Sequence, residues 1–139
     1  MQVSYSAESV LDSTLPRDDL RVLLVYPNTR DVAMANLGFQ QVYSLLNKIE
    51  GVICDRFAMP VGWKPETQYL ESEELRSMDL QMHPLEFDVI AFSISFEPDY
   101  LNTVLALKYF GIPVDRKERD SSFPMISAGG SAIFINPEP

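Results

Sequence analysis

The sequence has 139 residues, 46% of them hydrophobic, and a formal net charge of −9 at pH 7. This size and composition predict one globular domain with its own core and exclude a disordered chain. Because binding to nucleic acid needs clustered Lys and Arg, the acidic balance argues against a nucleic-acid partner, and no apolar run is long enough to span a membrane.

The first half of the chain has the pattern of a strand, a helix and a second strand. Residues 1–20 are polar and lack the basic and apolar regions of a signal peptide, so they predict a lead-in arm of a cytoplasmic protein. Residues 21–26 form a continuous apolar run, which is typical of a strand buried on both faces. Apolar residues then recur at helical spacing over 34–49, and residues 52–57 predict a second strand in which Cys54 is buried.

The second half repeats this alternation after a linker that prolines interrupt. Residues 66–76 predict a short acidic helix, and residues 77–87 predict a brief extended segment. Residues 88–93 are the clearest strand of the chain. Residues 98–111 predict a helix with Pro at its first position and Gly at its end, and residues 125–128 predict a fourth strand.

Strands that alternate with helices predict an open parallel sheet with right-handed crossovers, in a flavodoxin-like or Rossmann-like three-layer α/β sandwich. A complete flavodoxin-like sheet has five strands, whereas four are evident here. Residues 131–134 resemble the start of another crossover that stops at Pro139. We therefore expect residues 21–139 to be one α/β domain, truncated after its fourth strand and belonging to a longer chain.

The turn after the first strand excludes the common nucleotide-binding motifs. It reads YPNTRD over 26–31 and has none of the glycines of a dinucleotide-binding G-x-G-x-x-G fingerprint or of a P-loop. The first and third strands do not end in the acidic residues that a response-regulator receiver needs. Asn28 and Thr29 are also a poor match to the phosphate loop of flavodoxin.

Two other turns resemble those of cobalamin-binding domains. Such domains combine D-x-H-x-x-G after the first strand, S-x-L after the third and G-G after the fourth. This chain has SIS at 93–95 and GG at 129–130, but Ala33 and Asn36 stand where the first motif has its His and its Gly. The resemblance implies that the serine contacts a buried nucleotide tail and that the glycines let the backbone approach that tail closely.

Six residues of these turns are the candidate cofactor-binding residues, and we expect no catalytic or metal-ligating residue in the chain. The six are Asn28, Thr29, Ser93, Ser95, Gly129 and Gly130. Two alternatives stay open, because the serines could cap the following helix and the glycines could form a plain tight turn.

Over residues 19–139 the order and spacing of several segments resemble the N-terminal, cobalamin-binding-like domain of uncharacterised radical SAM iron–sulfur proteins. These segments are PN at 27–28, MANLG at 34–38, PLEFDVIAFS at 84–93, YLN at 100–102, GIP at 111–113, AGG at 128–130 and NPEP at 136–139. The resemblance implies a parent enzyme with a radical SAM barrel in the same chain, a 4Fe–4S cluster held by three cysteines, and S-adenosylmethionine. Cobalamin is then the candidate ligand of this domain, without the His that would coordinate cobalt.

Three functions follow in order of support. The first is an accessory domain of a radical SAM enzyme that is not itself catalytic, because the one cysteine excludes a C-x-x-x-C-x-x-C motif. The alternative is a protein–protein interaction module with no small-molecule ligand. The third is an independent enzyme that uses Asp31, Glu97 or His83 for acid–base chemistry, although Glu97 and Asp99 are more simply explained by a helix dipole.

Overall fold

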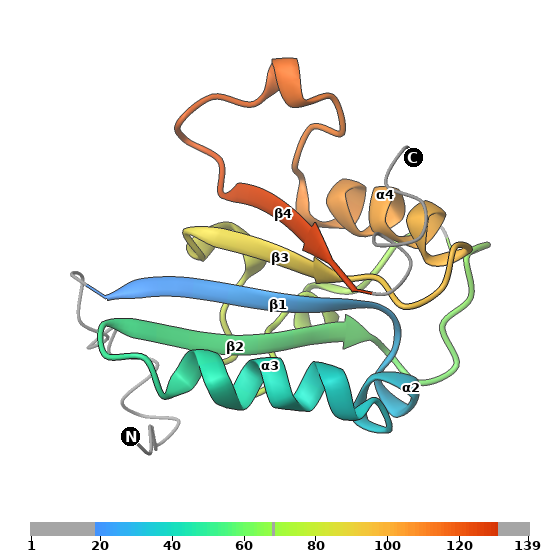
Figure 1. The fold of residues 1–139 in the computed structure, drawn as a ribbon. Helices are drawn as coiled ribbons and strands as arrows, with labels where there is room; N and C mark the ends of the chain where they lie inside the picture. Colours follow the sequence, from blue (N-terminus) through green and yellow to red (C-terminus); the bar gives the residue numbers. More distant parts are fainter. Residues whose placement is uncertain (1–18, 68, 131–139) are drawn as a thin grey trace.

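One sheet of four parallel strands, in the order β2-β1-β3-β4, forms the centre of the molecule (Figure 1). The computed structural model describes residues 19–67 and 69–130. The strands are β1 (Leu20–Thr29), β2 (Val52–Met59), β3 (Val89–Ser93) and β4 (Met125–Gly129). The parallel α/β sandwich predicted from the sequence is confirmed, and so are its four strands.

Three α-helices and three 3-10 turns connect the strands. The helices are α2 (Arg30–Met34), α3 (Leu37–Asn47) and α4 (Asp99–Phe110). The 3-10 turns are Ser72–Glu74, Pro84–Glu86 and Arg116–Glu118. Figure 1 shows α3 lying along β2, with α4 on the other side of the sheet. Within the described residues, no helix has the length and apolar character that crossing a membrane requires.

The two faces of the sheet are buried by different parts of the chain. On the α4 face, alternate residues of all four strands join α4 and the linker between β2 and β3 in a large core that includes Phe57, Ile90 and Phe110. On the α3 face, a smaller cluster centres on Tyr26 and Phe39, whose rings meet edge to face at 5.4 Å. We call these the α4 face and the α3 face.

The helix predicted over 34–49 is interrupted at its start. Asn36 accepts a hydrogen bond from the Phe39 N–H at 2.9 Å and so caps α3, while α2 ends at Met34. An Asn N-cap satisfies a free amide that a continuous helix would have bonded to its own backbone. At the other end of the fold, α4 stops at Gly111, whose positive φ of 79° is the left-handed C-cap that the sequence predicts.

The predictions for the linker were wrong. The described residues of 66–76 contain one 3-10 turn and no α-helix, because tertiary contacts hold this segment: the Tyr109 hydroxyl donates to the Thr67 carbonyl at 2.7 Å. Residues 77–87 are turns instead of an extended segment, since the Ser77 N–H bonds the Met82 carbonyl at 2.9 Å. The predicted lead-in arm, except for its last two residues, and the predicted crossover after Gly130 lie outside the described residues.

Candidate functional site

An open groove of about 530 Å³ lies on the α3 face, between α3 and the middle and carboxyl end of β3 and β4. Four of the six candidate residues line it, namely Ser93, Ser95, Gly129 and Gly130. Neighbouring small residues create the hollow, because the parallel register pairs Ala91 with Ser127 and Ser93 with Gly129. Side chains two apart on a strand share a face, so these small groups form a shallow floor beneath α3.

The walls of the groove are apolar, and its polar groups are uncharged. Leu24, Phe39 and Val42 supply aliphatic and aromatic surface, whereas Ser93 and Ser127 supply hydroxyl groups. No charged side chain is among the lining residues in the part of the chain that the structure describes. A groove of this chemistry suits a neutral, largely apolar group that makes a few hydrogen bonds, and it does not suit a phosphate.

Gly129 and Gly130, at the end of β4, differ in why a side chain is absent there. A Cβ on Gly130 would lie 2.4 Å from the Ile94 carbonyl oxygen, and the φ of Gly130 is +112°. Gly130 is therefore required by the close approach of two backbones, which the Ile94 N–H and the Gly129 carbonyl join at 2.8 Å. A Cβ on Gly129 would meet nothing within 4 Å, so a side chain there would occupy the groove.

Asn36 joins α3 to the turn after β3. Its Nδ2 donates to the Ser95 Oγ at 3.4 Å while its Oδ1 caps α3. The alternative in which Ser93 or Ser95 caps the next helix is wrong, because the N-cap of α4 is Pro98. Both serines instead face the groove, at the carboxyl end of β3 where open α/β sheets bind ligands.

Asn28 and Thr29, the other two candidate residues, are not among the residues that line the groove. The Asn28 Nδ2 donates to the Asp99 Oδ1 at 3.2 Å, and its own Oδ1 accepts the Thr29 N–H at 2.8 Å. Asn102 Nδ2 donates to the same Asp99 oxygen at 3.2 Å and to the Pro27 carbonyl at 2.9 Å. These bonds tie the end of β1 to α4.

Asp99 does more than favour a helix dipole. Its side chain is buried, and its Oδ2 has no hydrogen-bond partner among the described residues. Burial raises the pKa of Asp99, against the hydrogen bonds from Asn28 and Asn102. The spacing of Asp99 and Asn102, one helical turn apart, was the only signal of this cluster in the sequence.

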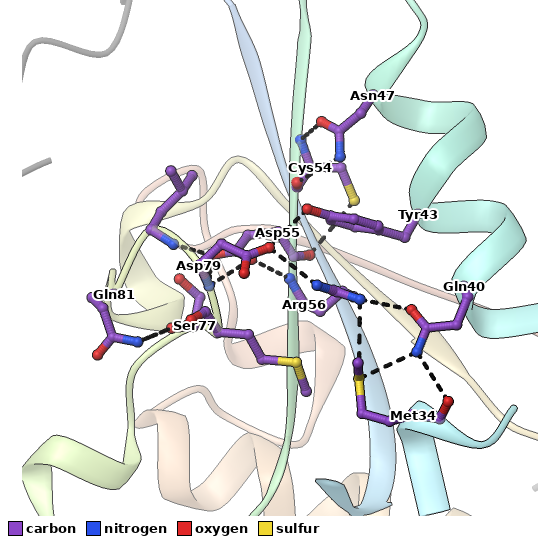
Figure 2. Close-up of polar contacts among 12 residues, drawn as sticks. Met34, Gln40, Tyr43, Asn47, Cys54, Asp55, Arg56, Ser77, Asp79 and Gln81 are labelled. Atoms are coloured by element: carbon purple, nitrogen blue, oxygen red, sulfur yellow. Dashed lines mark hydrogen bonds and ion pairs between the residues drawn. The ribbon is translucent and has the colours of Figure 1, made fainter. Parts of the chain in front are cut away.

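A second polar cluster, on the outer strand β2, holds the linker in place (Figure 2). The fully buried Asp55 carboxylate accepts the backbone N–H of Arg56 at 2.8 Å, that of Asp79 at 3.1 Å and that of Leu80 at 2.7 Å. Burial raises the pKa of Asp55, and the hydrogen bonds, the largest of them from Ser77, oppose that rise. This buried carboxylate folds residues 77–80 into turns, which the hydrophobic pattern could not reveal.

Arg56 faces the opposite way and fastens α3 to β2 (Figure 2). Its guanidinium donates to the Gln40 Oε1 at 2.7 Å, pairs with Asp79 at 3.2 Å and lies 4.0 Å from the centre of the Tyr43 ring. The Tyr43 hydroxyl donates to the same Asp79 carboxylate at 2.7 Å. These groups bond mainly to one another, so the cluster is a structural clamp.

The donor residues do not fit a metal centre of this chain. No group of three or more potential ligands occurs among the described residues. The one cysteine, Cys54, is buried, and burial raises the pKa of its thiol to about 12. A cluster that needs three thiolates therefore cannot be held here.

Cobalt also lacks a ligand from this chain at the expected position. Ala33, which stands at the His position of the cobalamin-type motif, is fully buried against Tyr26 and Phe39 and does not line the groove. His83 precedes the amino end of β3, opposite to the end where Ser93 lies, and its Nδ1 accepts the Leu85 N–H at 3.1 Å.

The family of the chain follows from comparison with known proteins. A model of the family described as "Radical SAM proteins, N-terminal" matches residues 38–139, from the start of α3 through β4 and beyond. Comparisons with curated proteins and with solved structures gave no significant match. The matched residues include most of α3 and all of β3 and β4, which together supply most of the residues that line the groove. This chain belongs to the family of N-terminal domains of radical SAM proteins.

Proposed function

We propose that the groove of this domain binds the neutral aromatic tail of a cobalamin-type ligand without supplying a ligand to cobalt. The family makes the chain an accessory part of a radical SAM protein, whose catalytic domain uses a 4Fe–4S cluster and S-adenosylmethionine. The accessory domain, which we take as residues 21–139 after an arm at 1–20, would hold and orient this ligand and leave the chemistry to the catalytic domain.

One observation carries the proposal. Ser93, Ser95, Gly129 and Gly130, chosen from two separate turns, line a single groove that is open and uncharged. A benzimidazole-like tail is planar and neutral, so it matches apolar walls with hydroxyl groups at the floor. Gly129 supports the proposal further, since its missing side chain leaves space inside the groove.

The alternative function is an interaction module with no small-molecule ligand. In that case we expect the crevice to be filled by side chains of the domain itself. Within the described residues, the small residues Ala91, Ser93 and Ser127 leave about 530 Å³ open, which disfavours this alternative.

The test is titration of the protein with hydroxocobalamin, followed by calorimetry and visible spectroscopy. We expect a dissociation constant on the order of micromolar. Gly129→Val, which places a side chain in the groove, should weaken binding about tenfold or more. Met125→Val is the matched control, because Met125 lies on the same strand and face but does not line the groove. Absence of heat and of a spectral change in the unmodified protein would contradict the proposal.

A further inference from the structure

The sulfur of Met34, at the end of α2, lies against two hydrogen-bond donors (Figure 2). Gln40 Nε2 donates to the Met34 Sδ at 3.2 Å, and Arg56 Nη1 lies 4.0 Å from the same sulfur. A thioether is a weak acceptor, so an amide and a charged guanidinium gain little from contact with it. Two good donors therefore converge on a point where the chain offers them no strong acceptor.

Both donors keep a hydrogen available for a stronger acceptor at this point. Gln40 Nε2 carries two hydrogens, and its other contact is the Met34 carbonyl at 3.4 Å. Arg56 Nη1 also carries two, of which one is donated to the Gln40 Oε1 at 2.7 Å. The Arg56 Nε is buried and has no hydrogen-bond partner among the described residues. The guanidinium is thus short of acceptors on the side where Met34 lies.

Met34 is open to small molecules in solution. It is 47% exposed, whereas Met59 and Met82 are buried in the α4-face core. Met125 is exposed as well, at 68%, but no donor contacts its sulfur in the part of the chain that the structure describes. Exposure alone therefore does not distinguish Met34 from Met125. The two converging donors do, and they make Met125 a matched control.

We propose that Met34 is a site of reversible oxidation, and that Gln40 and Arg56 hold the methionine sulfoxide which forms there. The oxidant is a small peroxide such as hydrogen peroxide. A lone pair of the sulfur attacks one peroxide oxygen, so that an S–O bond forms while the O–O bond breaks. The hydrogen of the transferred oxygen passes to the departing oxygen, which leaves as water. The sulfur loses two electrons and the peroxide gains them. Methionine sulfoxide reductases reverse this change.

Oxidation at this position tightens the clamp between α3 and β2. Oxidised methionines commonly disrupt their surroundings, because a polar group enters apolar packing. At Met34 the new oxygen instead meets an amide and a guanidinium, which bond more strongly to it than to a thioether. Gln40 belongs to α3 and Arg56 to β2, so one acceptor on α2 joins all three elements. The proposal depends neither on the family of the chain nor on the ligand proposed for the groove.

The test compares amide hydrogen exchange in the protein before and after treatment with hydrogen peroxide. Met125→Leu keeps Met34 available to the oxidant, Met34→Leu keeps Met125 available, and peptide mass spectrometry identifies the oxidised sulfur. We expect oxidised Met125→Leu to exchange about fivefold more slowly over residues 37–47, and oxidised Met34→Leu to show no change there. Unchanged or faster exchange after oxidation of Met34, or a Met34 that resists peroxide, would overturn the proposal.

A further variant checks that the contact with Gln40 holds the sulfoxide. Gln40→Glu keeps an oxygen for Arg56 but replaces the Nε2 donor by an oxygen that accepts only. Combined with Met125→Leu, it should still allow oxidation of Met34 and should abolish the slower exchange over residues 37–47. Circular dichroism establishes that the variants remain folded. Slower exchange that persists in the combined variant would overturn the assignment of Gln40 and with it the proposal.

Discussion

The two faces of the sheet differ in how fully the described chain covers them. On the α4 face, α4 and the linker bury residues of every strand, and Phe57 and Phe110 pack edge to face at 4.9 Å. On the α3 face, the small cluster around Tyr26 and Phe39 leaves Ser127 and Gly129 of β4 exposed. The comparison teaches that one face of the sheet is a closed structural core, whereas the other leaves a groove open beside α3.

The largest expected effect tests whether a buried phenylalanine contributes more to the free energy of unfolding on the α4 face than on the α3 face. Phe110→Ala should lower the free energy of unfolding by about 4 kcal/mol, because it opens a cavity in the closed core. Phe39→Ala should cost about 3 kcal/mol, since Phe39 borders the groove and water can fill the space. Urea unfolding monitored by the fluorescence of Trp63, which packs in the α4-face core, measures both. A larger loss of unfolding free energy for Phe39→Ala than for Phe110→Ala would contradict this difference between the two faces.

The next effect separates the two glycines at the edge of the α3 face. Gly130→Ala should destabilise the domain by about 3 kcal/mol, because its Cβ collides with the backbone of Ile94 and its φ is positive. Gly129→Ala should change stability by less than about 0.5 kcal/mol. Thermal unfolding of the two variants gives the difference, and similar melting temperatures would show that the glycines are not distinct.

A smaller effect tests how the linker is held on the α4 face. Asp55→Asn should cost about 2 kcal/mol, because an amide offers one acceptor oxygen where the carboxylate serves the N–H groups of Arg56, Asp79 and Leu80. Hydrogen exchange at Leu80 should accelerate. Asp88→Asn is the matched control, since the exposed Asp88 accepts one backbone N–H, that of Arg21. Equal losses in the two variants would mean that Asp55 does not organise the linker.

The smallest effect concerns Asp99 of α4, which accepts a hydrogen bond from Asn28 at the end of β1. Burial raises the pKa of Asp99 in the folded state above its pKa in the unfolded chain. Ionisation of Asp99 therefore lowers the free energy of unfolding as pH rises from the pKa of the unfolded chain through that of the folded state. Asp99→Asn removes this dependence and keeps an oxygen for Asn28 and Asn102. The variant should therefore gain stability relative to the unmodified protein as pH rises above the ordinary pKa of an aspartate, about 3.9. Urea unfolding across this range measures the gain, and a pH-independent difference would refute the prediction.

The regular elements could be predicted because their signals are local. The apolar run at 21–26 and the apolar residues within 88–93 identify strands, and Gly111 marks the end of a helix. The linker could not be predicted, because Asp55 and Tyr109, distant in sequence, determine where residues 66–87 turn. Its charge pattern indicated a helix, and tertiary hydrogen bonds prevented one.

The sequence by itself determined the parallel sheet, its strands and the turns at Ser93 and Gly129 that point to one edge, since strand and turn chemistry depend on neighbouring residues. Only the tertiary structure decided that Ser93, Ser95, Gly129 and Gly130 share a groove, whereas Asn28 bonds to Asp99 of α4 and Thr29 does not line the groove. Which face a side chain reaches depends on strand register and on the partners across the sheet. Those partners are residues far away in the chain. One of them is Asp99, whose buried carboxylate accepts a hydrogen bond from Asn28 and holds it away from the groove.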